Sequence, residues 1–309
     1  LGRPKGKVNE SMRLAPVARR LSELLGREVR ALRDCVGPEV EKDVTALRAG
    51  DVALLENLRF HPQEEGNDTE FSKSLARLGT VYVNDAFGSA HRAHASTAGV
   101  TLFLKPCLAG RLMKKEIEYL GRILSNPSRP FVAVFGGAKV SSKLSVLKSL
   151  LTKVDRLLIG GAMTYTFVAA RGGQIGRSLC EPDLYAEALG ILDEARRRNV
   201  EVVMPSDART VENADQPNTL KIFPSDKIPA GREGIDIGPD TLKKFTDSLN
   251  DAGTVFWNGP LGKFERPEYA EGTFGFARAL ASSRAVKVVG GGDCVSAVKA
   301  SGVADKIDH

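Results

Sequence analysis

The feature of this sequence that most restricts its fold is a short apolar run that ends in glycine, asparagine or aspartate and leads into a helical pattern. Residues 131–135 are followed by Gly136-Gly137, and residues 156–159 by Gly160-Gly161. The other runs are Thr80–Val83, Val200–Met204, Thr254–Trp257 and Ala285–Val289. Strands that are apolar throughout are typical of parallel sheets covered by helices on both faces. The pattern therefore predicts an α/β fold.

Helical patterns fall between these runs, and a proline-rich segment follows one of them. The expected helices are Pro16–Leu25, Asp68–Leu78, Leu108–Ser125 and Pro182–Arg198. With 309 residues, 42% of them hydrophobic, the chain has enough apolar material for two cores. We place the domain boundary at the break Asn126–Pro130. The prediction is an N-terminal domain over residues 1–112, a connecting helix and linker over 113–130, and a C-terminal domain over 131–309.

Composition excludes several classes of protein. The four cysteines form no C-x-x-C pair, which argues against a disulfide framework and a zinc site and favours a reducing compartment. No apolar run approaches the roughly 20 residues that span a bilayer. The net charge is +6, but basic residues form no long blocks and only 6% of residues are aromatic, so we expect no nucleic-acid partner. The positive charge suits a small anionic substrate equally well.

Two lysines follow the glycine turn after residues 131–135. If Ala138 begins a helix, Lys139 and Lys143 lie one turn apart on the same face. The glycines would let a ligand approach the backbone, and the helix start would offer free N–H groups to an anion. Two ammonium groups there would balance a transferring phosphoryl group. The alternative, a tight turn with two solvated lysines, is common in such folds.

A triglycine turn, Gly290-Gly291-Gly292, precedes Asp293 and Cys294 at a second strand–helix junction. Its backbone N–H groups suit phosphate, and the carboxylate of Asp293 suits Mg²⁺. The alternative is that Asp293 only caps the following helix. The dinucleotide pattern G-x-G-x-x-G fails here, because Val295 stands in place of the third glycine.

Arginines and one further loop complete the candidate sites. Arg3, Arg59 and Arg92 have the planar guanidinium that suits phosphate and carboxylate, although each alone is more often a surface ion-pair partner. The loop that follows the only tryptophan carries Asn258 and Glu265, and the carboxylate would accept hydrogen bonds from a ribose.

Together these segments resemble phosphoglycerate kinase over essentially the whole chain. The stretches that carry the resemblance, in the family's order, are LGRPKGKVNESMRLAPVA, LLENLRFHPQEEGN, VNDAFGSAHRAHAST, GGAKVSSK, IGGAM, FWNGPLGKFE and GGGDCVSAV. The resemblance implies two Rossmann-like domains joined by a helix and closing about it. It implies reversible phosphoryl transfer between ATP and the carboxylate of 3-phosphoglycerate, in glycolysis and gluconeogenesis, by a cytoplasmic monomer that uses Mg²⁺ with ATP or ADP.

The resemblance also implies a role for each matched residue. The three arginines, Arg3, Arg59 and Arg92, would bind 3-phosphoglycerate in the N-terminal domain. Lys143 would bind nucleotide phosphates, and Lys139 would reach the phosphoryl group during transfer. The other nucleotide contacts would be Gly160, Gly161, Asn258, Glu265, Gly291, Gly292, Asp293 and Cys294, with Asp293 also at the metal.

Departures from the family pattern limit this expectation. The family's first strand, a further substrate arginine and a histidine would precede Leu1, and a glycine-rich turn and helix would follow His309. Cys294 stands where the family usually has Thr or Ser. We therefore expect little or no turnover from these 309 residues alone and activity from the full-length parent. The alternatives are a non-catalytic Mg-nucleotide-binding module and, disfavoured by the failed glycine pattern, a pyridine-nucleotide dehydrogenase.

Overall fold

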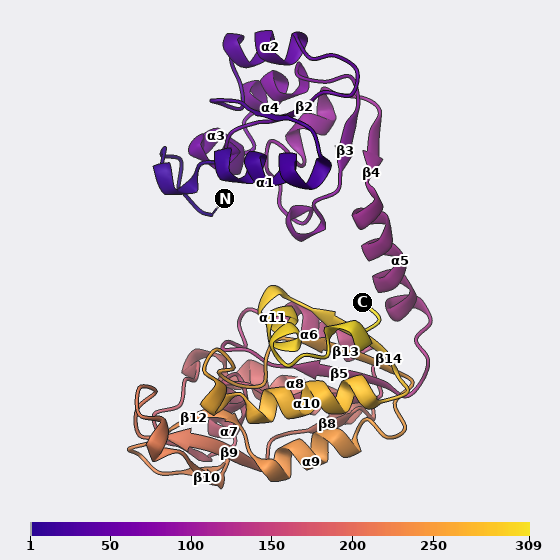
Figure 1. The fold of residues 1–309 in the computed structure, drawn as a ribbon. Coiled ribbons are helices and arrows are strands. Elements are labelled where there is room, and N and C mark those ends of the chain that lie inside the picture. Colours follow the sequence, from indigo (N-terminus) through magenta and orange to yellow (C-terminus); the bar gives the residue numbers. More distant parts are fainter. Residues whose placement is uncertain (1) are drawn as a thin grey trace. The chain divides into compact units, whose positions relative to one another are not determined.

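The computed structural model describes residues 2–309, except for the side chains of residues 122–124. The chain forms two compact units, Leu1–Leu120 and Gly121–His309, and the division falls within α5 (Arg111–Ser125). Each unit is visible as a separate body in Figure 1. No described helix is long and apolar enough to cross a membrane. The assignment of functions to the domains stays a prediction.

Unit 2 is built on a five-stranded parallel sheet with the strand order β14-β13-β5-β6-β8. The strands are β5 (Phe131–Phe135), β6 (Arg156–Ile159), β8 (Glu201–Val203), β13 (Thr254–Asn258) and β14 (Val286–Gly290). All five residues of β5, the central strand, are buried. Burial of both faces explains why these segments are apolar throughout rather than alternating.

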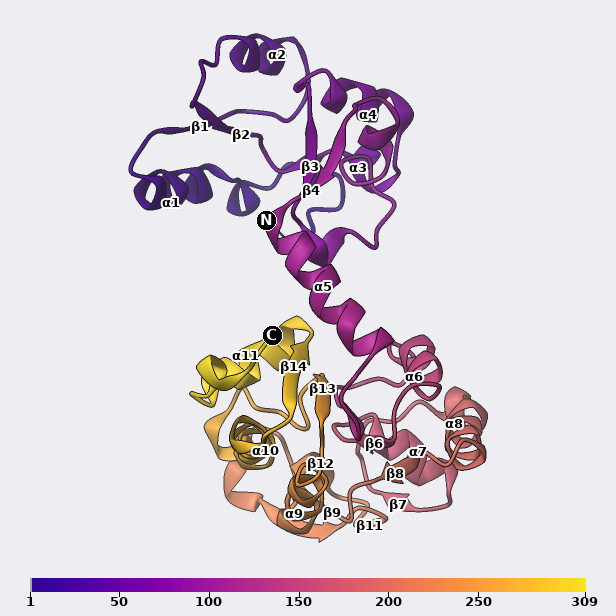
Figure 2. The same cartoon turned by 90° about the vertical axis from the view of Figure 1, so that its right-hand side faces the viewer.

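Helices cover both faces of this sheet, as Figure 2 shows. One face packs against α6 (Leu144–Leu150), α7 (Thr164–Ala170) and α8 (Tyr185–Arg197), and the other against α9 (Pro239–Asp247), α10 (Glu271–Ser282) and α11 (Gly292–Ala300). Successive residues of β5 point to opposite faces, Ala133 to the first core and Val134 to the second. Trp257 lies fully buried in the second core, with its ring 5.0 Å from that of Phe276.

Smaller sheets complete unit 2. β9 (Asp207–Val211) pairs antiparallel with β10 (Lys221–Pro224) and with β12 (Glu233–Ile237). β7 (Gln174–Ile175) pairs in parallel with β11 (Lys227–Ile228). The sequence analysis did not predict these elements, because they contain no uninterrupted apolar run: β9 (DARTV) and β12 (EGIDI) include charged residues, and β7 and β11 have two residues each.

Unit 1 contains two parallel pairs, β1 (Val29–Ala31) with β2 (Val52–Leu54) and β3 (Tyr82–Asn84) with β4 (Cys107–Ala109). Its helices are α1 (Ala15–Leu25), α2 (Pro38–Thr45), α3 (Pro62–Glu65) and α4 (Thr69–Ala76). α1 ends at Gly26, whose φ of +63° terminates a helix without the steric cost of a Cβ. The side chain of Asp68 caps α4 by accepting a hydrogen bond from the Phe71 N–H, 2.8 Å away.

The α/β class predicted from the sequence is confirmed, but two helix starts were wrong. The helix expected from Leu108 begins at Arg111, because Cys107–Ala109 pair with β3 and the Gly110 N–H donates to the carbonyl of Asn84. The helix expected from Ala138 begins at Leu144. The two lysines therefore do not lie one turn apart on a helix: Lys139 lies in the preceding loop, and Lys143 is the N-cap residue.

Candidate active site

Sheet register brings the polar strand ends of unit 2 together. Asn258 at the end of β13 pairs with Phe135 on one side and with Gly290 on the other, and Phe135 also pairs with Ile159. The turns that follow these four strands therefore start side by side along one edge. This is the carboxyl edge of a parallel sheet, where such folds bind ligands.

The glycine turns at this edge pack against one another through their backbones. The Gly137 N–H donates to the carbonyl of Pro260 (2.8 Å), and the Gly161 N–H donates to that of Leu261 (3.0 Å). A Cβ on Gly161, which has φ +67°, would lie 2.5 Å from the Gly137 nitrogen. The N–H groups of Gly137 and Gly161 therefore bond to carbonyls of the turn after β13, and the approach of a ligand to this backbone stays a prediction.

Gly160 is also closely packed within this edge. Its N–H donates to the carbonyl of Phe135 (2.7 Å), and a Cβ at this position would lie 2.5 Å from a methyl carbon of Leu261. The Gly160-Gly161 turn thus keeps the neighbouring strand ends close together. Whether it also borders a nucleotide stays a prediction.

Lys143 extends from the start of α6 to the strand ends. Its ammonium group contacts Oδ1 of Asn258. Burial lowers the pKa of Lys143, while the nearby Cys294 and Asp293 act in the opposite direction. These four residues, from three different strand–helix junctions, converge at one place. The chain thereby holds a half-buried cation beside the triglycine turn.

The triglycine turn leads directly into α11. Gly291 is the N-cap residue with φ +89°, and the residues Gly291, Gly292 and Asp293 are exposed to solvent. The first N–H groups of a helix have no partner within it, so this end of α11 attracts anions. A Cβ on Gly292 would meet no atom within 4 Å, which leaves room for a ligand.

Cys294 faces the protein interior rather than this open turn. Its thiol is buried, and Sγ lies 3.8 Å from the carbonyl oxygen of Trp257. Burial raises the pKa of Cys294 to about 12, so the thiol stays protonated at neutral pH. What Cys294 offers a ligand is therefore its backbone N–H in the first turn of α11.

The loop that carries Lys139 is held by a residue that the sequence analysis missed. Glu181 accepts hydrogen bonds from the Ser141 hydroxyl at Oε1 (2.6 Å) and from the Ser141 N–H at Oε2 (3.0 Å). Burial raises the pKa of Glu181, but the hydrogen bonds from Ser141 and the charge of Lys139 outweigh this and leave the pKa lowered. The Glu181 N–H donates to Oγ1 of the buried Thr166 on α7, which anchors the whole arrangement to the core.

Glu265 is exposed in the loop after β13, and the start of that loop is firmly fixed. The Lys263 N–H donates to the carbonyl of Ile235 (2.7 Å), and a Cβ on Gly262 would lie 2.2 Å from a carboxylate oxygen of Asp236. Asp236 accepts hydrogen bonds from the N–H groups of Gly272 and Thr273 at the start of α10. Burial of Asp236 raises its pKa to about 7, despite these hydrogen bonds.

In unit 1 the three segments that carry the candidate arginines meet around α3. The Arg59 guanidinium donates to the carbonyl of Gly2 (3.2 Å), which places it beside the segment of Arg3. The buried Glu64 accepts hydrogen bonds from the hydroxyl and N–H of Ser96, four residues beyond Arg92. Arg3 is exposed and Arg59 and Arg92 are half-buried, and the guanidinium of Arg59 also lies 3.5 Å from the carboxylate of Glu65.

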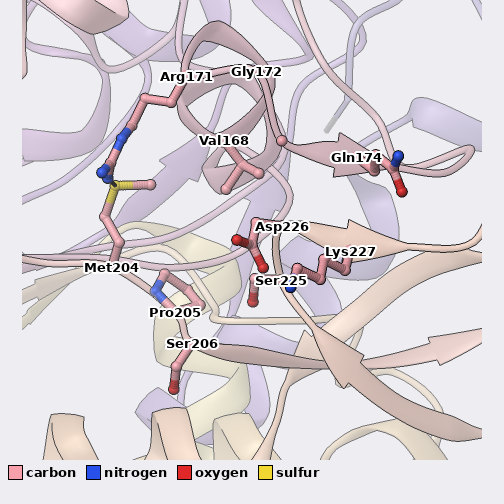
Figure 3. A pocket seen from close by; sticks show the side chains of 11 residues that line it. Val168, Arg171, Gly172, Gln174, Met204, Pro205, Ser206, Ser225, Asp226 and Lys227 are labelled. Carbon is pink, nitrogen blue, oxygen red and sulfur yellow. Dashed lines mark hydrogen bonds between the residues drawn. The ribbon is translucent and has the colours of Figure 1, made fainter.

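A pocket of about 690 Å³ in unit 2 contains none of the predicted site residues. Figure 3 shows the guanidinium of Arg171 beside the Met204 sulfur on one side and Asp226 and Lys227 on the other. Because Lys143 and the triglycine turn do not line this pocket, it is separate from the convergence described above.

The family model for phosphoglycerate kinase matches residues 1–309. Over the whole chain, the sequence is 52% identical to phosphoglycerate kinase of Moorella thermoacetica and 49% identical to that of Chlorobaculum tepidum, covering 78% and 79% of these relatives. The structure of phosphoglycerate kinase from Coxiella burnetii matches with a TM-score of 0.83 at 38% identity, covering 99% of this chain and 77% of that one. The chain belongs to the phosphoglycerate kinase family.

Proposed function

We propose that unit 2 binds the phosphates of ATP or ADP at the carboxyl edge of its sheet, and that unit 1 binds 3-phosphoglycerate. The observation that carries the proposal is the convergence of Lys143, Asn258 and the start of α11 at one sheet edge. A half-buried ammonium group and the unpaired N–H groups of a helix start are both suited to phosphate oxygens. Lys143 and the Gly291–Cys294 turn then form the nucleotide phosphate site.

The proposed reaction requires charge neutralisation rather than a general base. The acceptor is a substrate carboxylate, which is already ionised at pH 7 because its pKa is about 4. Cations and oriented N–H groups stabilise a phosphoryl group in transfer by offsetting the charge on its oxygens. Lys139 is the residue that we propose to meet the transferring group; its exposure in the loop that Glu181 holds supports this role.

Asp293 is the residue proposed to meet Mg²⁺. It is exposed in the first turn of α11 and is a single carboxylate rather than part of an acidic cluster in the described chain. This fits Mg²⁺, which is often bound by one or two carboxylates together with the substrate phosphates. When bound with the nucleotide, Mg²⁺ would neutralise phosphate charge.

In unit 1 we propose that Arg3, Arg59 and Arg92 bind the phosphate and carboxylate of the glycerate. Guanidinium groups donate two parallel hydrogen bonds to either group. The contact of Arg59 with Gly2 supports a shared position for the first two arginines. We also propose that Glu265 binds the ribose, and that the protein is a cytoplasmic monomer. The four free cysteines suit a reducing compartment such as the cytoplasm.

Calorimetry separates the kinase from a non-catalytic Mg-nucleotide-binding module. The kinase proposal predicts that both MgADP and 3-phosphoglycerate bind to the chain, with Arg59→Ala weakening only the second. The module would bind MgADP alone. Absence of 3-phosphoglycerate binding would therefore reject the role proposed for unit 1.

The role of Lys139 has a different signature from that of Lys143. If Lys139 meets charge only during transfer, Lys139→Ala in the full-length parent lowers the turnover number by at least about tenfold, or about 1.4 kcal/mol, and leaves MgADP affinity within about twofold. Lys148→Ala, at an exposed position on α6, is the matched control. An unchanged turnover number would reject the assignment of Lys139.

A further inference from the structure

A thiol, an imidazole and a carboxylate converge in unit 1, outside the residues assigned above. Asp34 and Cys35 lie in the loop that follows β1, and His61 is the residue between the 3-10 turn Leu58–Phe60 and α3. One donor atom from each lies within 4.8 Å of the others. In the part of the chain that the structure describes, no other group of three or more Cys, His, Asp or Glu residues does this.

Contacts within the protein hold these three side chains in place. The Cys35 N–H donates to Oδ1 of Asp34 (2.7 Å), and the Glu56 N–H donates to the carbonyl of Asp34 (3.3 Å), which ties the loop to the segment after β2. The His61 ring lies 5.3 Å from that of Phe71 on α4. Donor groups that the fold already positions need little ordering when a ligand binds.

The burial of the three groups differs in a way that suits a metal with one open position. Cys35 is fully buried, whereas Asp34 and His61 are partly exposed, with 50% and 29% of their side-chain surface accessible. A cation entering between the exposed pair would meet the thiol on its inner side and keep water on its outer side. Three protein ligands and one water form a common tetrahedral arrangement for zinc.

The chemistry of the donors selects the metal. Mg²⁺ and Ca²⁺ prefer oxygen ligands, while a set of sulfur, nitrogen and oxygen suits Zn²⁺. We propose that Asp34, Cys35 and His61 bind Zn²⁺ with water as the fourth ligand. On binding, Cys35 releases its thiol proton to solvent. The 2.6 Å hydrogen bond between His61 Nε2 and Asp34 Oδ1 is replaced by bonds from both atoms to the metal, and the proton of that hydrogen bond leaves Nε2 through solvent, so that the bound ring carries its proton on Nδ1.

A second imidazole–carboxylate pair in unit 1 serves as a comparison for this proposed zinc site. His94 Nδ1 lies 3.7 Å from Oε1 of the buried Glu64, so it also pairs an imidazole with a carboxylate. Among the described residues, no thiol completes that pair as a group of three. The proposal therefore predicts that zinc distinguishes between two His–carboxylate pairs of the same unit. It does not depend on the function proposed for the lysine and glycine turns.

The test is titration of the metal-free chain with ZnCl₂ and, separately, with CoCl₂, whose absorption reports thiolate coordination. We expect one metal ion per chain, a thiolate-to-cobalt absorption band and a higher melting temperature of unit 1, because a ligand that binds only the folded state stabilises it. Cys35→Ser should abolish the band, and His61→Gln should weaken Zn²⁺ binding at least about tenfold.

Matched controls make the outcome decisive. His94→Gln and Cys107→Ser should bind Zn²⁺ as the unchanged chain does. The proposal is overturned if the unchanged chain takes up no stoichiometric metal, or if His61→Gln and Asp34→Asn both retain its affinity. If circular dichroism shows that Cys35→Ser does not fold, the variants His61→Gln and Asp34→Asn, at partly exposed positions, decide the question.

Discussion

Replacing Glu181 by alanine tests whether the Lys139 loop is held in position from outside the loop. The substitution removes both acceptors of the Ser141 hydroxyl and N–H. Because Glu181 is only partly buried, we assign each hydrogen bond a modest net free energy of about 1 kcal/mol, which gives about 2 kcal/mol for the pair. Without these bonds, part of the free energy of MgADP binding would be used to order the loop. A loss of about 2 kcal/mol corresponds to a fall in MgADP affinity of about 30-fold, at about 1.4 kcal/mol per factor of ten.

A double-mutant cycle isolates the contact itself. Ser141→Ala removes the hydroxyl but keeps the N–H, so it should cost about 1 kcal/mol of binding free energy. Once Glu181 has been replaced, the same change should cost almost nothing. The expected coupling between the two residues is therefore about 1 kcal/mol, measured from four calorimetric titrations with MgADP.

Asp183→Ala is the matched control for this experiment, since it removes an exposed acid two residues further along the chain. It should change MgADP affinity by less than about twofold. Strictly additive effects of the Glu181 and Ser141 substitutions, or a Glu181→Ala variant with unchanged affinity, would refute the reasoning.

Two further predictions concern the stability of unit 2, which the fluorescence of Trp257, the only tryptophan, reports during urea unfolding. Asp236 has a folded pKa of about 7 against an ordinary 3.8, so the folded state binds the extra proton. The protonated carboxyl therefore stabilises unit 2 below about pH 4, and this contribution of up to about 4 kcal/mol is lost as the pH rises to about 7. Asp236→Asn should remove this dependence of the free energy of unfolding on pH. The same pH dependence in the unchanged chain and the variant would contradict the prediction. Gly161→Ala should destabilise by at least about 2 kcal/mol, because φ is +67° and the new Cβ would meet the Gly137 backbone. Gly190→Ala, where a Cβ on α8 would meet open space, should raise the free energy of unfolding slightly. Similar changes in the free energy of unfolding at both glycines would contradict the prediction.

The sequence was sufficient to predict the parts of the fold that depend on local periodicity. The five strands of the main sheet of unit 2 were found because each lies in a short, mainly apolar run, and β5 and β6 had the predicted bounds. The polar turns after them were identified for the same reason, since they interrupt apolar runs. That Asn258 and Gly290 then lie side by side follows from the register of a parallel sheet.

Contacts between distant segments were beyond the reach of such reasoning. Ser141 and Glu181 are 40 residues apart, and their hydrogen bonds join Glu181 to residues 138–143, which form a loop where we expected a helix from Ala138. Likewise, His61 meets Asp34 across 27 residues, a contact that cysteine spacing does not reveal. Nor does a glycine pair reveal whether its N–H groups face a ligand or, as at Gly137, a neighbouring carbonyl.

The most direct test of the account is the affinity of the chain for MgADP when Lys143 is replaced by alanine. Loss of the ammonium group that contacts Asn258 beside the triglycine turn should weaken binding at least about tenfold in calorimetry, equivalent to about 1.4 kcal/mol. Lys148→Ala, one turn further along α6, should bind MgADP as the unchanged chain does. Equal affinity of the Lys143→Ala variant and the unchanged chain would contradict the proposal that this edge of the sheet holds nucleotide phosphates.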